Sequence, residues 1–320
     1  MKNLKNIILY ADDDLEPGVM ERSLLIAQTF NVRIIVVHVV EASASHTFLS
    51  EHNLDLDDVE RQMVAHKREV LTRALQNHDC TGIDISVTVL IGDPLQKIIE
   101  LTDSLEDSLL IKAPSPDYGL RNKLFGGIDL QLMRSCPCPV EIGRPKTQEG
   151  GNRIVIAIDY DGTDKLKYLL NERLLAAALL AVSGRHLELY VLHAWTIYGH
   201  SLLASGRGKL SPENLKKLND GEYAEREEWL QNRVNQFKSN LDEKQAKRFT
   251  PRLEILRGKP IDVIPQRVEE LNTDLLCLGT ASRSGLKALL VGNSAEEIIQ
   301  RVNCTVGVLK PEGFESPISS

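Results

Sequence analysis

Residues 6–12 read NIILYAD, and residues 153–159 read RIVIAID. Each stretch is a short apolar run that ends in aspartate. A run without polar alternation is typical of a parallel strand that is buried on both faces. One stretch lies near the start and the other near the middle of a chain of 320 residues, which indicates two copies of one unit.

Four further pairs of similar segments follow these two runs in the same order. They are RIIVVHVV at 33–40 with LELYVLHA at 187–194, GDP at 92–94 with GKP at 258–260, SLLIK at 108–112 with DLLCL at 274–278, and CPVEI at 138–142 with CTVGV at 304–308. Strands that alternate with helical periodicity form βαβ units with right-handed crossovers. We therefore predict an α/β protein of two tandem, doubly wound, five-stranded parallel sheets. A polar, turn-forming stretch places the boundary near residue 148, which gives domains 1–147 and 148–320.

Composition limits the classes of function. The net charge of −7 argues against a surface that binds nucleic acid by neutralising phosphates. No window approaches the ~20 apolar residues that span a bilayer, so no membrane contact is expected. Five cysteines are too few for a disulfide framework in a chain of this length, which fits a reducing compartment. We expect a cytoplasmic protein.

A loop of small residues connects the apolar run at 275–278 to a predicted helix start. The candidate cofactor-binding residues in this loop are Gly279, Ser282, Arg283, Gly292, Asn293 and Ser294. Backbone N–H groups in the first turn of a helix have no partner within the helix. A strand, a small-residue loop and a helix start together therefore form a cradle for an anion.

The spacing of this loop resembles the nucleotide-binding loop of the universal stress protein family, G-x2-G-x9-G-[ST]. Gly279 and Gly292 match the first and third glycines, whereas Ser282 stands at the second glycine and Asn293 at the hydroxyl position. The resemblance extends from about residue 5 to about residue 310. It implies that the second copy binds ATP or another adenine nucleotide, weakly, because a non-glycine residue in a left-handed loop position costs roughly 1–2 kcal/mol. Arg283 partly offsets this cost as a nearby cation.

The resemblance has further implications for architecture and role. Members of the family associate through their last strand, so the closing strands 140–142 and 306–308 are expected to pair in an internal pseudo-dimer. Each would otherwise be an unpaired edge. The family also implies a stress-response binding or signalling protein rather than an enzyme, with a role in survival that includes resistance to DNA damage. A homodimer of the whole chain and an unidentified protein partner stay open.

Asp159 and Ser294 each have two interpretations. The resemblance gives Asp159 a contact with the adenine or ribose, and its counterpart in the first copy is Asp12, Asp13 or Asp14. Alternatively, these carboxylates cap the next helix, where aspartate is favoured. Ser294 lies where the family contacts phosphate, but SAEE at 294–297 also reads as a capping box.

The first copy lacks the loop. Where the second copy has Gly279, the first has the sequence KAPSP at 112–116, and each proline removes an N–H donor. Asp129 stands near the next helix start and would repel a phosphate. We predict that the first domain binds no nucleotide in the manner of the family.

Other chemistry receives little support from the sequence. The pair Cys136 and Cys138 has no second pair at zinc spacing, so we interpret it as buried and structural and predict no metal site. His38 and His193 end equivalent strands and read as core histidines with satisfied ring nitrogens. No nucleophile elbow or Walker loop is present, so no catalytic residue is predicted.

Two alternatives to a nucleotide sensor stay open. One is a scaffold without ligand, and the other is a slow ATPase, for which no convincing general base is found. Both copies carry a long insertion after their second strand, and such a segment would lie over the carboxyl edge of the sheet. In the second copy the charged helix from Glu222 to Lys247 reads as an amphipathic cover with a solvated face.

Overall fold

The computed structural model describes residues 4–12, 14–41, 56–115, 127–143, 152–182, 187–197, 210–280 and 293–318. The first half consists of β1 (Asn6–Tyr10), α1 (Pro17–Phe30), β2 (Arg33–Val40), α3 (Leu56–Leu75), β3 (Ile85–Ile91), α4 (Pro94–Ser104), β4 (Ser108–Lys112), α5 (Gly127–Ser135) and β5 (Val140–Ile142). The second half consists of β6 (Arg153–Ala157), α6 (Lys165–Val182), β7 (Glu188–Trp195), α8 (Pro212–Ser239), α9 (Glu243–Arg248), β8 (Arg252–Arg257), α10 (Pro260–Glu270), β9 (Leu275–Gly279), α11 (Asn293–Arg301) and β10 (Thr305–Leu309). The boundary predicted near residue 148 lies outside the described residues.

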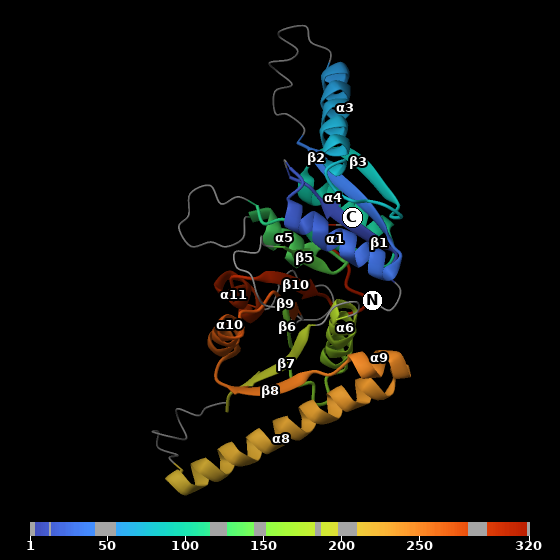
Figure 1. Cartoon of the computed structure of the whole chain (residues 1–320). Coiled ribbons are helices and arrows are strands. Elements are labelled where there is room, and N and C mark those ends of the chain that lie inside the picture. Colours follow the sequence, from blue (N-terminus) through green and yellow to red (C-terminus); the bar gives the residue numbers. More distant parts are fainter. Residues whose placement is uncertain are drawn as a thin grey trace.

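One sheet of ten strands runs through both halves (Figure 1), in the order β3-β2-β1-β4-β5-β10-β9-β6-β7-β8. Each half contributes five parallel strands in the same order, which confirms the predicted fold. The two halves join where β5 and β10 pair antiparallel, with Val140 opposite Val308 and Ile142 opposite Val306. The closing strands therefore pair with each other, as the sequence predicted, and neither is left as an edge.

The two Gly-x-Pro turns have the same conformation in both halves. Gly92 (φ 139°) follows β3 and Gly258 (φ 148°) follows β8, in a region of backbone space that side chains rarely allow. A Cβ on Gly258 would lie 2.3 Å from Cγ1 of Val263. Pro94 and Pro260 then begin α4 and α10, at a position where a missing N–H leaves no hydrogen bond unmade.

The helices cover both faces of the sheet and enclose three hydrophobic cores. One core is shared by the two halves, because it contains Leu132 of α5 and Val140 of β5 together with Ile299 of α11 and Val306 of β10. On the opposite face each half has a core of its own, beneath α1 and α3 in the first half and beneath α6 and α8 in the second. The continuous sheet and the shared core make the two halves one body, the internal pseudo-dimer.

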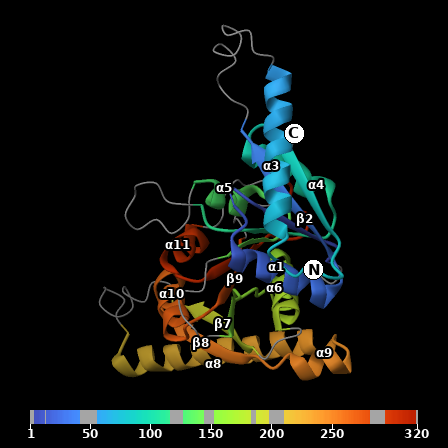
Figure 2. The same cartoon turned by 45° about the horizontal axis from the view of Figure 1, so that its top comes forward.

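The insertion of the second half forms two helices. α8 runs along the outer side of this half in both views (Figures 1 and 2). It buries Leu230, Val234 and Phe237 against the core beneath α6. The prediction of one continuous charged helix to Lys247 is wrong, because α8 ends at Ser239 and a capping box at Asp242 begins α9. Within the described ranges, no helix has both the length and the apolar character needed to cross a membrane.

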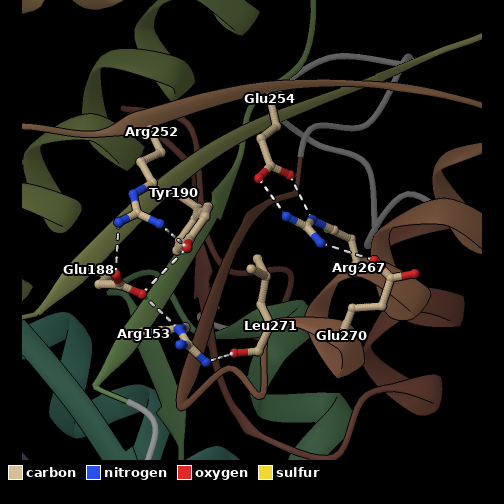
Figure 3. A network of polar contacts seen from close by, with 8 residues as sticks. All are labelled: Arg153, Glu188, Tyr190, Arg252, Glu254, Arg267, Glu270 and Leu271. Carbon is tan, nitrogen blue, oxygen red and sulfur yellow. Dashed lines mark hydrogen bonds and ion pairs between the residues drawn. The ribbon is translucent and has the colours of Figure 1, made fainter.

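Ion pairs close the amino edge of the sheet in the second half (Figure 3). Glu188 of β7 pairs with Arg153 of β6 at 2.7 Å and with Arg252 of β8 at 2.9 Å. Arg153 also donates to the carbonyl of Leu271 at 2.8 Å. These contacts are partly exposed, so each adds little stability by itself. They occupy the end of the sheet opposite to the one where open α/β folds bind ligands.

Candidate functional site

The first half places a lysine at the carboxyl edge of its sheet. Lys112 is the last residue of β4, beside Tyr10 at the end of β1. Its side chain is 1% exposed, and its Nζ lies 2.5 Å from Oδ2 of Asp12 and 3.0 Å from Oδ1 of Asp129. A buried ammonium group needs such partners, because removing one member of a buried ion pair typically costs about 3–5 kcal/mol.

Asp129 lies in the first turn of α5, and its side chain is fully buried. Its carboxylate accepts the backbone N–H of Ser115 at 2.9 Å and the hydroxyl of Ser115 at 3.0 Å. A helix start attracts negative charge through its dipole and its free N–H groups. In the first half, a carboxylate of the chain itself therefore stands where a helix start would otherwise receive an anion. Pro114 lies in the same segment, and Pro116 lies outside the described residues.

Among the residues described for the second half, none forms an equivalent of this cluster. The strand registers place Leu278 of β9 where the first half has Lys112 of β4. The third residue of α11 is Ala295, whereas the third residue of α5 is Asp129. The buried lysine and the buried carboxylate are thus both replaced by apolar residues, and the two carboxyl edges differ in charge.

Asp159 follows β6 at the carboxyl edge and is largely exposed. Its side chain is 66% exposed, and its Oδ2 lies 2.5 Å from Nζ of Lys167 on α6. The cap of α6 is instead Asp164, which accepts the backbone N–H groups of Leu166 at 3.0 Å and Lys167 at 3.2 Å. In the first half the cap of α1 is Glu16. The interpretation of Asp159 as a helix cap is therefore wrong, and so is that of Asp12 and Asp14, whereas Asp13 lies outside the described residues. Asp159 keeps a carboxylate directed to solvent.

Gly279 ends β9, close to α6. A Cβ at this position would lie 2.6 Å from Cδ2 of Leu170, so glycine is required here by the packing of α6 on β9. The next residue, Thr280, is buried and donates its backbone N–H to Leu309 at 2.9 Å. The other predicted loop residues, Ser282, Arg283 and Gly292, lie outside the described residues.

The start of α11 differs from the predicted capping box. The helix includes Asn293, so Ser294 lies inside its first turn and not at its N-cap. Ser294 is exposed. Glu297, the glutamate at N3 of that box, lies 4.0 Å from Arg301 of the same helix. Glu296 pairs with Arg134 of α5 in the first half. This contact links the two halves and compensates a negative charge that would otherwise lie near the start of α11.

A cluster around Asp161 was not found from the sequence. The side chain of Asp161 is 3% exposed and pairs with Arg233 of α8 at 2.6 Å. It also accepts the indole N–H of Trp229 at 2.8 Å. The Trp229 ring packs edge-on against Tyr160 and His193, with centroid distances of 5.3 and 5.0 Å. α8 is thereby fixed over the ends of β6 and β7, next to Asp159.

His193 lies in the core, whereas His38 is half-buried. The prediction of satisfied ring nitrogens is wrong for His193, because its Nε2 is buried without a hydrogen-bond partner in the described structure. Nδ1 of His38 lies 2.8 Å from the carbonyl of Ala11, and Nδ1 of His193 lies 3.1 Å from the carbonyl of Ile158. Each ring therefore ties the second strand of its half to the residue after the first strand. Burial lowers the pKa of His193. Among the residues that the structure describes, no three His, Cys, Asp or Glu side chains are grouped to hold a metal ion.

Curated relatives match most of the chain. Universal stress protein E of Photorhabdus laumondii is 27% identical over 258 residues, which is 75% of this chain and 73% of that protein. The protein of the same name from Escherichia coli K12 is 24% identical over 239 residues, 74% of this chain and 72% of its own length. A universal stress protein E homolog from Haemophilus influenzae is 24% identical and covers 79% of both chains.

Solved structures share the fold of the whole chain. A putative universal stress protein from Pseudomonas aeruginosa UCBPP-PA14 has a TM-score of 0.66 at 21% identity and covers 97% of this chain and 95% of its own. A universal stress protein from Archaeoglobus fulgidus has a TM-score of 0.57 at 19% identity, with coverage of 96% and 97%. The model of the universal stress protein family matches residues 5–142 and 151–310. Because both halves match, the chain belongs to the universal stress protein family, as a tandem of two family domains.

Proposed function

We propose that this protein is a stress-response binding protein whose second half binds ATP or another adenine nucleotide weakly, at the carboxyl edge of its sheet. The first half then serves as a scaffold that binds no nucleotide. The observation that carries this proposal is the difference between the two edges. Lys112, Asp12 and Asp129 fill the edge of the first half with paired charges, and the described part of the second half has Leu278 and Ala295 at the positions of Lys112 and Asp129.

In the first half a nucleotide would have to displace internal bonds. Asp129 accepts the N–H and the hydroxyl of Ser115, and Lys112 pairs with the two carboxylates of Asp12 and Asp129. A phosphate in this place would meet Asp12 and Asp129 at close range, and like charges at a buried site are strongly unfavourable. The family mode of binding is therefore disfavoured here.

In the second half the charges that face the edge favour a weak site. Asp159 is exposed and available to hydroxyl groups of a ribose, since a carboxylate accepts hydrogen bonds. Lys167 beside it supplies a cation, and the charge of Glu296 is compensated by Arg134. The spacing of Gly279 and Gly292 matches two glycines of the family's nucleotide-binding loop, and the proposed contact with phosphate rests on this match.

A second candidate is an interaction scaffold without ligand, again in the stress response and in resistance to DNA damage. This candidate is favoured by the position of α8, which covers the carboxyl ends of β6 and β7. Trp229 and Arg233 of this helix bind the buried Asp161. A large base has less room at an edge that a helix covers. Under this alternative, α8 serves as a surface for a protein partner.

Titration of the full chain with labelled ATP tests the proposal, together with mass spectrometry of small molecules released from the purified protein. We expect one weak site per chain, and an Asp159→Ala variant should bind about 10- to 150-fold more weakly, because hydrogen bonds to a charged group contribute about 1.5–3 kcal/mol. Asp220→Ala, which removes an exposed carboxylate from α8, is the matched control and should bind as the wild type does. An empty protein that does not bind ATP would favour the scaffold. Release of inorganic phosphate in the same incubation would support the slow ATPase.

A further inference from the structure

Two cysteines face each other in the loop between α5 and β5. The Sγ atoms of Cys136 and Cys138 lie 3.4 Å apart. Cys136 is fully buried in the core that the two halves share, and its Sγ lies 3.5 Å from the hydroxyl of Thr102. Cys138 is half-buried. The loop thus presents one thiol toward the surface and keeps the second directly behind it.

A cavity of about 200 Å³ opens onto Cys138. The lining residues used below are Cys138, Arg173, Asp103 and Asp107. Asp107 is compensated by Lys5, at 3.1 Å, and Asp103 is exposed. Arg173 comes from α6 of the second half and has no hydrogen-bond or ion-pair partner among the described residues. The cavity therefore combines a thiol with a cation that forms no ion pair among the described residues, and the charge of Glu312 acts on this cation from farther away.

Lys310, from the second half, interacts electrostatically with Cys136 and Cys138. Lys310 directly follows β10 and is buried, and its Nζ donates to Thr280 Oγ1 at 2.9 Å and to the carbonyl of Met133. Burial lowers the pKa of Lys310 to about 7, and negative charge on Cys136 or Cys138 opposes this shift. A thiolate on either cysteine therefore stabilises the ammonium form of Lys310.

The two thiols differ in acidity. Burial raises the pKa of Cys136, but its hydrogen bonds to Cys138 and Thr102 and the charge of Lys310 outweigh burial and lower the pKa below that of an ordinary thiol. The hydrogen bond to Cys136 and burial raise the pKa of Cys138. A thiolate in this pair therefore rests on Cys136, within 3.4 Å of the thiol that faces the cavity.

We propose that Cys136 and Cys138 form a thiol–disulfide exchange site for low-molecular-weight disulfides that carry carboxylates, with Arg173 binding a carboxylate in the cavity. Cys138 passes its proton to Cys136, and its Sγ attacks the disulfide RS–SR. One S–S bond breaks, a mixed disulfide forms on Cys138, and RS⁻ leaves. RS⁻ takes the proton from Cys136, whose Sγ then attacks Sγ of Cys138 and releases the second RS⁻.

The exchange balances without a further reagent. The reduced pair holds one proton, because Cys136 is the thiolate, and the ammonium group of Lys310 holds the second. The first RS⁻ takes the proton of the pair. Once the thiolate is consumed, Lys310 releases its proton through solvent to the second RS⁻, so the products are one protein disulfide, two thiols RSH and neutral Lys310. The protein is oxidised by two electrons, and the small disulfide is reduced by two. The new bond would lie directly before β5, the strand through which the two halves pair. The site therefore connects the redox state of small thiols to the joint of the pseudo-dimer.

Glutathione disulfide is the probe for the full-length protein. After incubation and alkylation of the remaining thiols, mass spectrometry of the peptide that contains residues 136–138 should show loss of two hydrogens and no alkyl group. Cys136→Ser should stop at the mixed disulfide on Cys138, and Cys138→Ser should leave Cys136 unmodified. Cys80→Ser is the matched control, because Cys80 is also half-buried but lies outside the cavity, and should not change the result.

A second comparison tests the role of Arg173 and does not depend on the cysteine variants. Arg173→Gln should slow the reaction with glutathione disulfide by about two- to five-fold, the range of one partly exposed ion pair, and should have less effect on the neutral hydroxyethyl disulfide. Equal slowing with both probes would overturn the preference for carboxylates. The exchange site itself is overturned if wild-type Cys136 and Cys138 both stay alkylatable under conditions that modify Cys80.

Discussion

The ammonium group of Lys112 lies 3.0 Å from the carboxylate of Asp129, and both side chains are buried at the carboxyl edge of the first half. The partners come from different elements, since Lys112 ends β4 and Asp129 lies in the first turn of α5. The pair closes the edge at which an open α/β sheet binds ligands. The second half keeps the same backbone arrangement with Leu278 and Ala295 at the corresponding positions.

The first prediction tests this pair. Lys112→Met keeps the length of the side chain and removes the charge, which leaves two carboxylates without their cation. The free energy of unfolding should fall by about 3–5 kcal/mol in chemical denaturation. The double variant Lys112→Met, Asp129→Asn should lose less than the single variant, because it removes one uncompensated charge. A single variant as stable as the wild type would show that the ion pair contributes nothing to the fold.

The second prediction concerns the hydrogen bond between Trp229 and Asp161. Trp229→Phe keeps an aromatic ring but removes the indole N–H, and should lower the free energy of unfolding by about 1.5–3 kcal/mol, as for a hydrogen bond to a charged group. Trp195→Phe is the matched control, because the indole N–H of Trp195 is buried without a partner in the described structure. Thermal or chemical unfolding should show a clearly smaller loss for the control. Equal losses would mean that ring size, and not the bond to Asp161, fixes α8.

The third prediction concerns pH. Burial lowers the pKa of Lys310 to about 7, well below the value of 10.5 for free lysine. Between these values the unfolded chain holds the proton and the folded protein does not, so the contribution of Lys310 makes stability rise with pH over this window and stay constant below it. Lys310→Met lacks this contribution. The difference in free energy of unfolding, wild type minus variant, should increase by about 1.4 kcal/mol per pH unit above pH ~7. A difference that does not change with pH would contradict the shifted pKa.

The fourth prediction concerns the loop after β9, in which Ser282 stands at the second glycine of the family motif. Ser282→Gly should strengthen the affinity for ATP by about 1 kcal/mol, because glycine adopts a left-handed conformation at little cost. Ser284→Gly changes a serine of the same loop that does not stand at a motif glycine, and serves as the control. Calorimetric titration of the full chain should separate the two variants. Unchanged or weaker binding by Ser282→Gly would mean that the serine contacts the ligand or that the loop holds no anion.

Several features of the fold could be predicted because they depend on local pattern. Apolar runs such as 6–10 and 153–157 mark strands that are buried on both faces, and their repetition gave the two five-stranded units. The pairing of Val140–Ile142 with β10 followed from the need to cover two short apolar edges. For the candidate site, the motif predicts only the positions of Gly279, Asn293 and Ser294 along the chain. It does not predict which atoms these residues contact, because a motif specifies spacing alone.

The sequence alone therefore determined the repeat, the five parallel strands of each half and the loss of the glycine loop in the first half. The tertiary structure decided which charges meet. Lys112 stands 100 residues from Asp12, and Asp161 stands 68 residues from Trp229, so no local pattern records these pairs. A buried charge is tolerated only where folding brings a partner to it, and that depends on the packing of distant elements. The same reason explains Glu296, which the chain places in the first turn of a helix and which pairs with Arg134 across the joint of the two halves.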